Sequence, residues 1–149
     1  MSFRFFIRFL FVFVVNSLVS QESIDKNSVE NLFLEYTKKP REVSFAHINK
    51  STFIKGEYLG FTTYNLNKET KNLSNITFNL FCTITDKNEK VIKKKLLKVE
   101  NGIANNVFKI DSLFSSGEYK FMVYTNWMKN FKEQNFFVQT FKVIDPEIN

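Results

Sequence analysis

Few residues of this chain fall into a pattern that could do covalent or metal chemistry. His47 is the only histidine and Cys82 the only cysteine, so no second histidine or cysteine cluster gives the spacing of a metal site. Serine and carboxylate residues are present, but no Gly-x-Ser-x-Gly turn occurs. We therefore expect no enzymatic activity, no cofactor and no metal ion, with an unrecognised hydrolase using His47 as the least favoured alternative.

The two candidate reactive side chains also fit ordinary structural roles. Cys82 alternates with Leu80 and Ile84, which predicts a thiol buried as a small apolar side chain. His47 alternates with Phe45 in the same way and is expected to be a strand histidine. The segment 86–89, Asp-Lys-Asn-Glu, lacks the ligand spacing of a calcium loop and is typical of a hairpin turn.

A cluster of aromatic and basic residues is the best candidate for recognition. Its members, which we name the interaction loop, are Asn126, Trp127, Met128, Lys129 and Phe131. Tryptophan, methionine and phenylalanine are enriched at the centres of protein interfaces, so the loop predicts contact with a partner or a neighbouring domain. The alternative is that Trp127 covers the core beneath the loop, and one ring could do both with its two faces.

The elements that hold these residues follow an N-terminal segment with the features of a signal peptide. Arg4 and Arg8 precede the apolar run 9–15, which is shorter than the roughly 20 residues of a membrane span. We predict cleavage after Ser20, or alternatively after Ser17, and keep an uncleaved anchor as the alternative. No cysteine follows that could carry a lipid. The mature chain is therefore expected to be secreted to the periplasm or outer-membrane surface, with no transmembrane span.

The remaining chain has the size of one domain. Loss of Arg4 and Arg8 leaves 19 of the 21 basic residues against 15 acidic ones, a net charge of about +4. The single cysteine excludes an intrachain disulfide, so the fold depends on its core. The 19 phenylalanines and 5 tyrosines offer ample material for one.

Residues 21–40 predict a polar lead-in with a short amphipathic helix. Asn27, with Glu30 three residues later, is a helix-start signal, and Pro40 ends the helix. One face carries the apolar residues Val29, Leu32, Phe33 and Tyr36. A helix this short is marginal alone, so we expect it to dock on the domain or, alternatively, on another protein.

Residues 41–146 alternate between apolar and polar side chains in a way that predicts β-strands. Seven segments are expected, at about 44–49, 57–65, 76–85, 90–99, 103–110, 118–126 and 136–143, and residues 147–149 form a tail. No helix intervenes, so strand pairs must be mainly antiparallel. The predicted fold is all-β: an immunoglobulin- or fibronectin III-like antiparallel sandwich of about seven strands, preceded by a short N-terminal helix. A barrel is the alternative.

A dense run of lysines falls in the fourth predicted strand. Lys93, Lys94 and Lys95 cannot all face the same side, because consecutive strand residues point in opposite directions. Lysines at a strand edge also oppose edge-to-edge aggregation, so a solvated edge is the favoured interpretation. An anionic partner such as lipid headgroups or polysaccharide is the alternative, whereas export argues against nucleic acid.

One motif favours the sandwich. Leu113, Gly117 and Tyr119 have the order of a tyrosine corner, in which a tyrosine hydroxyl bonds to upstream backbone where the chain crosses between sheets. A tyrosine simply packed at the start of a strand is the alternative.

Several segments between about Arg41 and Pro146 resemble the macroglobulin domain, in particular the second macroglobulin domain of α2-macroglobulin-related envelope proteins of Bacteroidetes. The similar pieces are residues 48–57 (Ile-Asn-Lys-Ser-Thr-Phe-Ile-Lys-Gly-Glu), 99–104, 116–119 and 124–128. Asn49 and Lys55 stand where the family usually has Asp and Pro. The thioester motif of complete macroglobulins is absent.

The resemblance implies a non-catalytic module that binds a protein partner or neighbouring β-sandwich domains at the bacterial envelope, in an outer-membrane complex or next to a TonB-receptor plug-like segment. The chain would then be either a stand-alone module or a truncated piece of a longer protein. A secreted domain that binds a small ligand or glycan is the second hypothesis.

Overall fold

The computed structural model describes residues 26–147, so the predicted signal peptide and its cleavage positions, Ser17 and Ser20, lie outside the described residues. The chain divides into two compact units between Lys39 and Pro40, and each is described by itself. None of the helices within residues 26–147 has the length and apolar character that crossing a membrane requires.

The N-terminal unit contributes one helix, α2 (Lys26–Lys38). The helix includes Asn27, the residue of the predicted start signal, in its first turn. None of its residues is buried, and its apolar side chains include Val29, Leu32 and Phe33. The predicted docking of this face stays a prediction.

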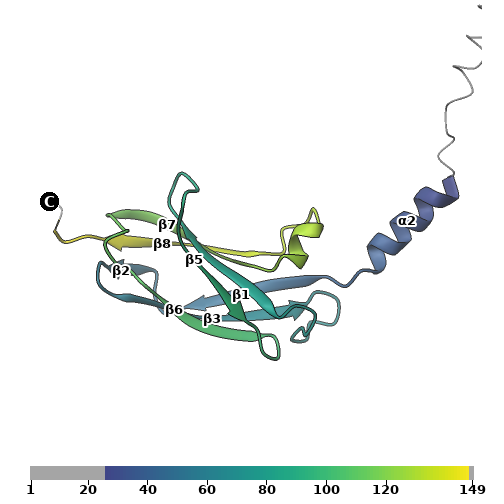
Figure 1. The fold of residues 1–149 in the computed structure, drawn as a ribbon, viewed down its shortest axis with the longest axis horizontal. Helices are drawn as coiled ribbons and strands as arrows, with labels where there is room; N and C mark the ends of the chain where they lie inside the picture. Colours follow the sequence, from purple (N-terminus) through teal and green to yellow (C-terminus); the bar gives the residue numbers. More distant parts are fainter. Residues whose placement is uncertain (1–25, 148–149) are drawn as a thin grey trace, which may run out of the picture. The chain divides into compact units, whose positions relative to one another are not determined.

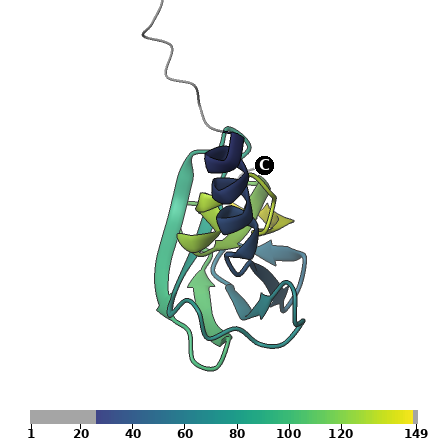
Figure 2. The same ribbon diagram turned by 90° about the vertical axis from the view of Figure 1, so that its right-hand side faces the viewer.

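The second unit is a β-sandwich, as predicted, and not a barrel, because its strands form two separate sheets (Figure 1). The three-stranded sheet has the order β1-β3-β6 and the five-stranded sheet the order β2-β8-β7-β4-β5. Figure 2, turned by 90° from Figure 1, shows the blue β1 and β3 in one layer and the yellow-green β7 and β8 in the other. The strands are β1 (Glu42–Ile48), β2 (Thr52–Ile54), β3 (Tyr58–Asn67), β4 (Asn79–Thr85), β5 (Val91–Lys98), β6 (Ile103–Lys109), β7 (Gly117–Tyr124) and β8 (Phe137–Ile144).

The sheets contain eight strands rather than about seven. The additional strand, β2, has only three residues and pairs in parallel with β8, while every other strand pair is antiparallel within the described residues. Three residues are too few for an alternation pattern, so this strand could not be seen in the sequence.

The third predicted strand begins later than expected. β4 starts at Asn79, and Phe78 is 62% exposed, although it continues the alternation of Leu80, Cys82 and Ile84. These last three side chains are buried as predicted. Alternation therefore marks the core face of β4 but not the place where pairing with its neighbours begins.

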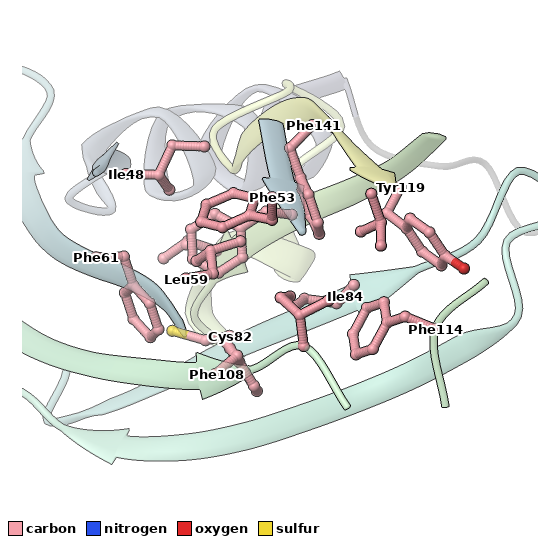
Figure 3. Packing of buried hydrophobic residues seen from close by; sticks show 14 of the residues in the cluster. Ile48, Phe53, Leu59, Phe61, Cys82, Ile84, Phe108, Phe114, Tyr119 and Phe141 are labelled. Carbon is pink, nitrogen blue, oxygen red and sulfur yellow. The ribbon is translucent and has the colours of Figure 1, made fainter. Parts of the chain in front are cut away.

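Seven of the 17 residues in the buried cluster between the sheets are aromatic (Figure 3). Phe141 lies between Phe53, at 5.5 Å between ring centroids, and Tyr119, at 5.8 Å. Phe61 and Phe121 meet across the sheets at 4.9 Å. Alternation in β7 produces this arrangement, because Tyr119, Phe121 and Val123 all point inward.

The interior becomes polar towards the end where β1 begins. Glu42 is fully buried there, and its carboxylate accepts hydrogen bonds from Ser74 Oγ at 2.7 Å, Thr77 N at 3.2 Å and Thr77 Oγ1. Burial raises the pKa of Glu42, because no cation offsets the loss of water, while these hydrogen bonds act in the opposite direction. Nearby, Ser44 Oγ donates to Asn65 Oδ1.

Candidate binding groove

The interaction loop forms a short 3-10 helix, η1 (Trp127–Asn130), between β7 and β8. Trp127 Nε1 donates to the backbone oxygen of Pro40 at 2.9 Å, and its ring meets that of Phe131 edge-on at 5.4 Å. The guanidinium of Arg41 lies 3.7 Å from the centre of the Phe131 ring. We name Trp127, Phe131 and Arg41 the clamp, because their contacts hold the chain at Pro40 and Arg41, just before β1.

Met128 also points inward. It is 3% exposed, and its sulfur lies 3.5 Å from the backbone nitrogen of Thr125 and 3.7 Å from Ser44 Oγ. Of the predicted interaction residues, only Asn126 and Lys129 are therefore exposed. Trp127 is half-buried, and Phe131 is buried against the sandwich.

Lys129 leads instead to an aromatic surface on the outer face of the five-stranded sheet. Its ammonium lies 4.6 Å from the ring centre of Tyr124 and 5.9 Å from that of Phe81. The two rings stack at 5.4 Å with 19° between their planes. Lys94 of β5 lies 4.6 Å from the centre of the Phe81 ring. Both lysines sit where the negative face of an aromatic ring attracts a cation.

A cavity of about 440 Å³ adjoins this surface. Met122 and Tyr124 of β7 form one wall with Phe136, and the segment after η1 contributes Lys132 and Gln134. Phe136 is 37% exposed, and Val138, the neighbour of Met122 across the sheet, is 38% exposed. We name this cavity, with Phe81, Val138 and Lys94, the groove.

The groove carries positive charge that the described residues do not neutralise. Lys94, Lys129 and Lys132 form no ion pair within residues 26–147. Glu133 also lines the cavity, but it pairs with Lys68, and its carboxylate lies 3.7 Å from Arg41 Nε. The hydrogen bond from Lys68 is the main reason that the pKa of Glu133 is lowered.

The other lysines of the run lie elsewhere. Lys95 Nζ donates to the backbone oxygen of Val107 at 2.7 Å, and Lys93 Nζ donates to that of Lys109 at 2.9 Å. These two side chains therefore occupy backbone acceptors of the edge strand β6, as a protected edge requires. Lys94 points the other way, towards the groove, which agrees with the predicted alternation.

At the opposite end of the sandwich, Tyr119 makes the bonds that define a tyrosine corner. Its hydroxyl donates to the backbone oxygen of Ser115 and accepts from the nitrogen of the same residue, each at 3.0 Å. Gly117 begins β7. Leu113, by contrast, is 61% exposed, and Phe114 packs against the Tyr119 ring at 5.0 Å. Phe114, rather than the expected Leu113, is therefore the residue that packs against the corner tyrosine.

The remaining candidates for chemistry are not assembled into a site. Burial raises the pKa of the Cys82 thiol to about 12, so the thiolate nucleophile is suppressed. His47 is exposed on the outer face of the three-stranded sheet and makes no hydrogen bond to a serine or a carboxylate of residues 26–147. The described part of the chain contains no group of three or more His, Cys, Asp or Glu side chains that could hold a metal ion.

Phe81 and Tyr124 are groove residues that sequence reasoning did not propose as a site, and Lys94 was considered only as part of the lysine run. One signal was available, since an aromatic residue at position 81 interrupts the otherwise polar outer face of β4. No local pattern, however, connects Phe81 with lysines of β5 and η1, which only the sheet pairing brings together.

Comparison with solved structures gives a macroglobulin-like fold. An Escherichia coli alpha-2-macroglobulin activated by porcine elastase matches with a TM-score of 0.56 and 16% identity, over 69% of this chain and 8% of that chain. The native E. coli alpha-2-macroglobulin matches at 0.55 and 16%, and a Salmonella alpha-2-macroglobulin reacted with methylamine at 0.54 and 14%. Each of these two matches covers 68% of this chain.

This likeness is one of fold, because the identities are low. The chain spans only 6% to 8% of the length of these proteins. No protein-family model and no curated protein matches the sequence.

Proposed function

We propose that this chain is an exported, non-catalytic β-sandwich module that binds a protein partner or a neighbouring domain through the groove. The observation that carries the proposal is the groove itself, where half-exposed aromatic side chains lie beside three lysines that form no ion pair with any described residue. Accessible aromatic surface of this kind marks interaction sites on folded domains.

The macroglobulin-like fold supports a modular role. The matched region of the E. coli and Salmonella proteins is a small part of a much longer chain, so this fold occurs there beside other parts of a large protein. The sequence resemblance to modules of Bacteroidetes envelope proteins points the same way. It suggests neighbours that are further β-sandwich domains or a TonB-receptor plug-like segment, either in a longer protein or in a complex with this module.

Residues 1–20 support the location. Their charged start and short apolar run are typical of secretory signals, and export would place the module in the periplasm or on the outer-membrane surface. Cell fractionation, with and without residues 1–20, tests this part of the proposal independently of binding.

A glycan-binding role has weaker support. A shallow hollow of about 370 Å³ on the three-stranded sheet is lined by His47, Asn49 and Asn106, which are suitable hydrogen-bonding residues. However, the Asn49 amide already bonds to Tyr58 O and Gly60 N, and Asn106 Oδ1 accepts from Lys95 Nζ. These amides are engaged with the protein itself, so the groove is the better candidate.

Site-specific photocrosslinking in the living source organism tests the binding role. A benzoyl-phenylalanine at Val138 samples the groove, and the same residue at Tyr58, which is 55% exposed, samples the other sheet. We expect a discrete protein adduct from position 138 that is absent from position 58. Identical adducts from both positions, or none from position 138, would contradict the proposal.

A further inference from the structure

The groove has an apolar floor that is exposed on the surface of the sandwich unit, residues 40–147. Phe136 and Val138 are exposed by more than a third, and Tyr124 and Met122 beside them are half-exposed. Removing such surface from water favours association by about 25 cal/mol for each Å² of apolar area. The volume of about 440 Å³ is enough for one large apolar side chain of a partner.

The charges of the groove that form no ion pair within residues 40–147 are all positive. The ammonium groups of Lys94 and Lys129 lie 4.6 and 5.9 Å from the centre of the Phe81 ring, so a carboxylate beside this ring can meet either of them. Lys132 lines the cavity itself, where a second carboxylate would meet it. The groove therefore complements a ligand that carries at least two negative charges beside an apolar group.

The acidic side chain within the groove does not meet this need. Glu133 is held by Lys68 and lies close to Arg41 on the side of the first strand, so its charge is already balanced. Lys94 and Lys129 are also too exposed to be held by burial, and their partners in the described structure are aromatic rings. No carboxylate of residues 40–147 forms an ion pair with either lysine, so both can accept the carboxylates of a partner.

We propose that the groove binds an acidic segment of a partner protein, with a large apolar side chain in the cavity and flanking Asp or Glu residues on Lys94, Lys129 and Lys132. This inference rests on the proposed binding role and specifies the chemistry of the partner. The three lysines come from β5, from η1 and from the segment before β8, so they are spread over several elements. An extended chain with several carboxylates offers one for each of the three lysines.

Calorimetric titration of the full chain with three synthetic peptides tests the proposal. The probes are acetyl-EDFEDLED-amide, the neutral acetyl-QNFQNLQN-amide and the basic acetyl-KKFKKLKK-amide. We expect binding of the acidic peptide, at least about tenfold weaker binding of the neutral one, and weakening of the acidic complex with rising salt. Equal binding of the acidic and neutral peptides would overturn the role of the lysines.

A charge-reversed pair locates the site. K94E/K129E should weaken binding of the acidic peptide by about tenfold or more, because two attractive contacts become repulsive. K87E/K142E changes the net charge equally at exposed lysines without ion pairs and outside the groove, and should leave binding within about twofold. Equal loss in both variants would show attraction to the whole surface and would overturn the proposal. Circular dichroism confirms that each variant is folded, and K94Q/K129Q replaces the reversed pair if it is not.

An experiment with lipid vesicles distinguishes an acidic protein segment from a membrane surface as the partner. The full chain and K94E/K129E are each sedimented with vesicles of pure phosphatidylglycerol. We expect no lipid binding that depends on Lys94 and Lys129, so the two proteins should sediment with the vesicles to the same small extent. If the vesicles bind the natural chain but not K94E/K129E, and the acidic peptide fails to bind, the partner is a lipid surface and the proposal is wrong. If crosslinking at Val138 identifies a protein but all peptides fail, the binding role stands and the acidic chemistry is wrong.

Discussion

The two halves of the sandwich interior are closed by different means. In the aromatic half, Phe61 of the three-stranded sheet packs with Phe121 of the five-stranded sheet, beside Phe53, Tyr119 and Phe141, without any need for matched hydrogen bonds. In the polar half, which contains Glu42, Ser44, Asn65 and Ser74, hydrogen bonds connect side chains at the end where β1 begins. The clamp and η1 lie at this polar end, because Ser44 Oγ is 3.7 Å from the sulfur of Met128.

This difference indicates that the aromatic half contributes most of the stability, whereas the polar half fixes the arrangement of its side chains. Aromatic burial is non-directional and its contribution grows with the area removed from water. The polar half contributes little net energy for each bond but fixes one arrangement, because a buried group without a partner is costly. A rigid polar end is a suitable support for η1, whose Lys129 reaches the groove.

The largest effect should come from the centre of the aromatic half. Phe121→Ala removes a fully buried ring that contacts both Phe61 and Phe108, and should lower the free energy of unfolding by about 3–5 kcal/mol. Urea unfolding followed by circular dichroism measures this loss. Val138→Ala, on the exposed face, is the control and should change stability by less than about 1 kcal/mol. Equal losses would contradict the assignment of the core.

The backbone of the polar half should be the next most sensitive. Gly102 has a φ of +76°, and a Cβ there would meet Asn65 O and the Cβ of Leu73 at 2.9 Å each. Gly102→Ala should therefore lower the free energy of unfolding by about 2–4 kcal/mol, as urea unfolding will show.

Gly56 provides the matched control for this prediction. Its φ is +102°, but a Cβ there would have no heavy atom within 4 Å. Gly56→Ala should thus report the conformational strain alone, about 1–2 kcal/mol. If the two variants lose the same stability, the close packing around Gly102 contributes nothing.

The tyrosine corner tests a single pair of hydrogen bonds in the aromatic half. Tyr119→Phe keeps the ring against Phe114 and Phe141 but removes both bonds to Ser115. We expect a loss of about 1 kcal/mol in the free energy of unfolding. The control is Tyr58→Phe, at an exposed position, where no measurable change is expected. A loss similar to that of Phe121→Ala would mean that the corner, rather than the rings, holds this half together.

The smallest expected effects are changes in the free energy of unfolding with pH, which should have opposite signs for Glu42 and Asp145. The raised pKa of Glu42 means that its favourable contribution is complete below its usual value of 4.5 and is lost as pH rises through the raised value. Glu42→Gln keeps an acceptor for Ser74 and Thr77 without the charge, so it should gain stability relative to the natural chain between pH 4 and pH 7. Urea unfolding at both pH values measures the difference.

Asp145 is the counterpart, next to β8 at the other end. Its pKa is lowered, mainly by the 2.6 Å hydrogen bond from Lys55, so its contribution is present above the usual value of 3.8 and is lost as pH falls further. Asp145→Asn should therefore be less stable than the natural chain at pH 7, with a smaller deficit at pH 3. If the difference in stability between either variant and the natural chain does not change with pH, the environment assigned to that carboxyl group is wrong.

The sequence was sufficient to predict the sandwich because alternation and turn residues are local signals. Cys82 and Tyr119 could be assigned to the inner face for the same reason. Glu42 could not, since a charged residue is normally solvated and its partners Ser74 and Thr77 lie more than thirty residues away. The interaction loop was correctly noticed as aromatic and basic, but the groove depends on Phe81 and Lys94, which only the pairing of β4 with β5 and β7 places beside Lys129.

The clamp around Trp127 has a mechanical consequence. β1 begins beside Asn135, whereas β8 ends beside Lys55, so the chain enters the sandwich at one end and leaves at the other (Figure 1). Tension between Pro40 and Asp145 would therefore run along the strands and load their hydrogen bonds in shear rather than one at a time. The Trp127 bond to Pro40 and the Arg41 contact with Phe131 would bear force before β1 could peel from β3. The clamp is therefore the first contact that such a pull would have to break.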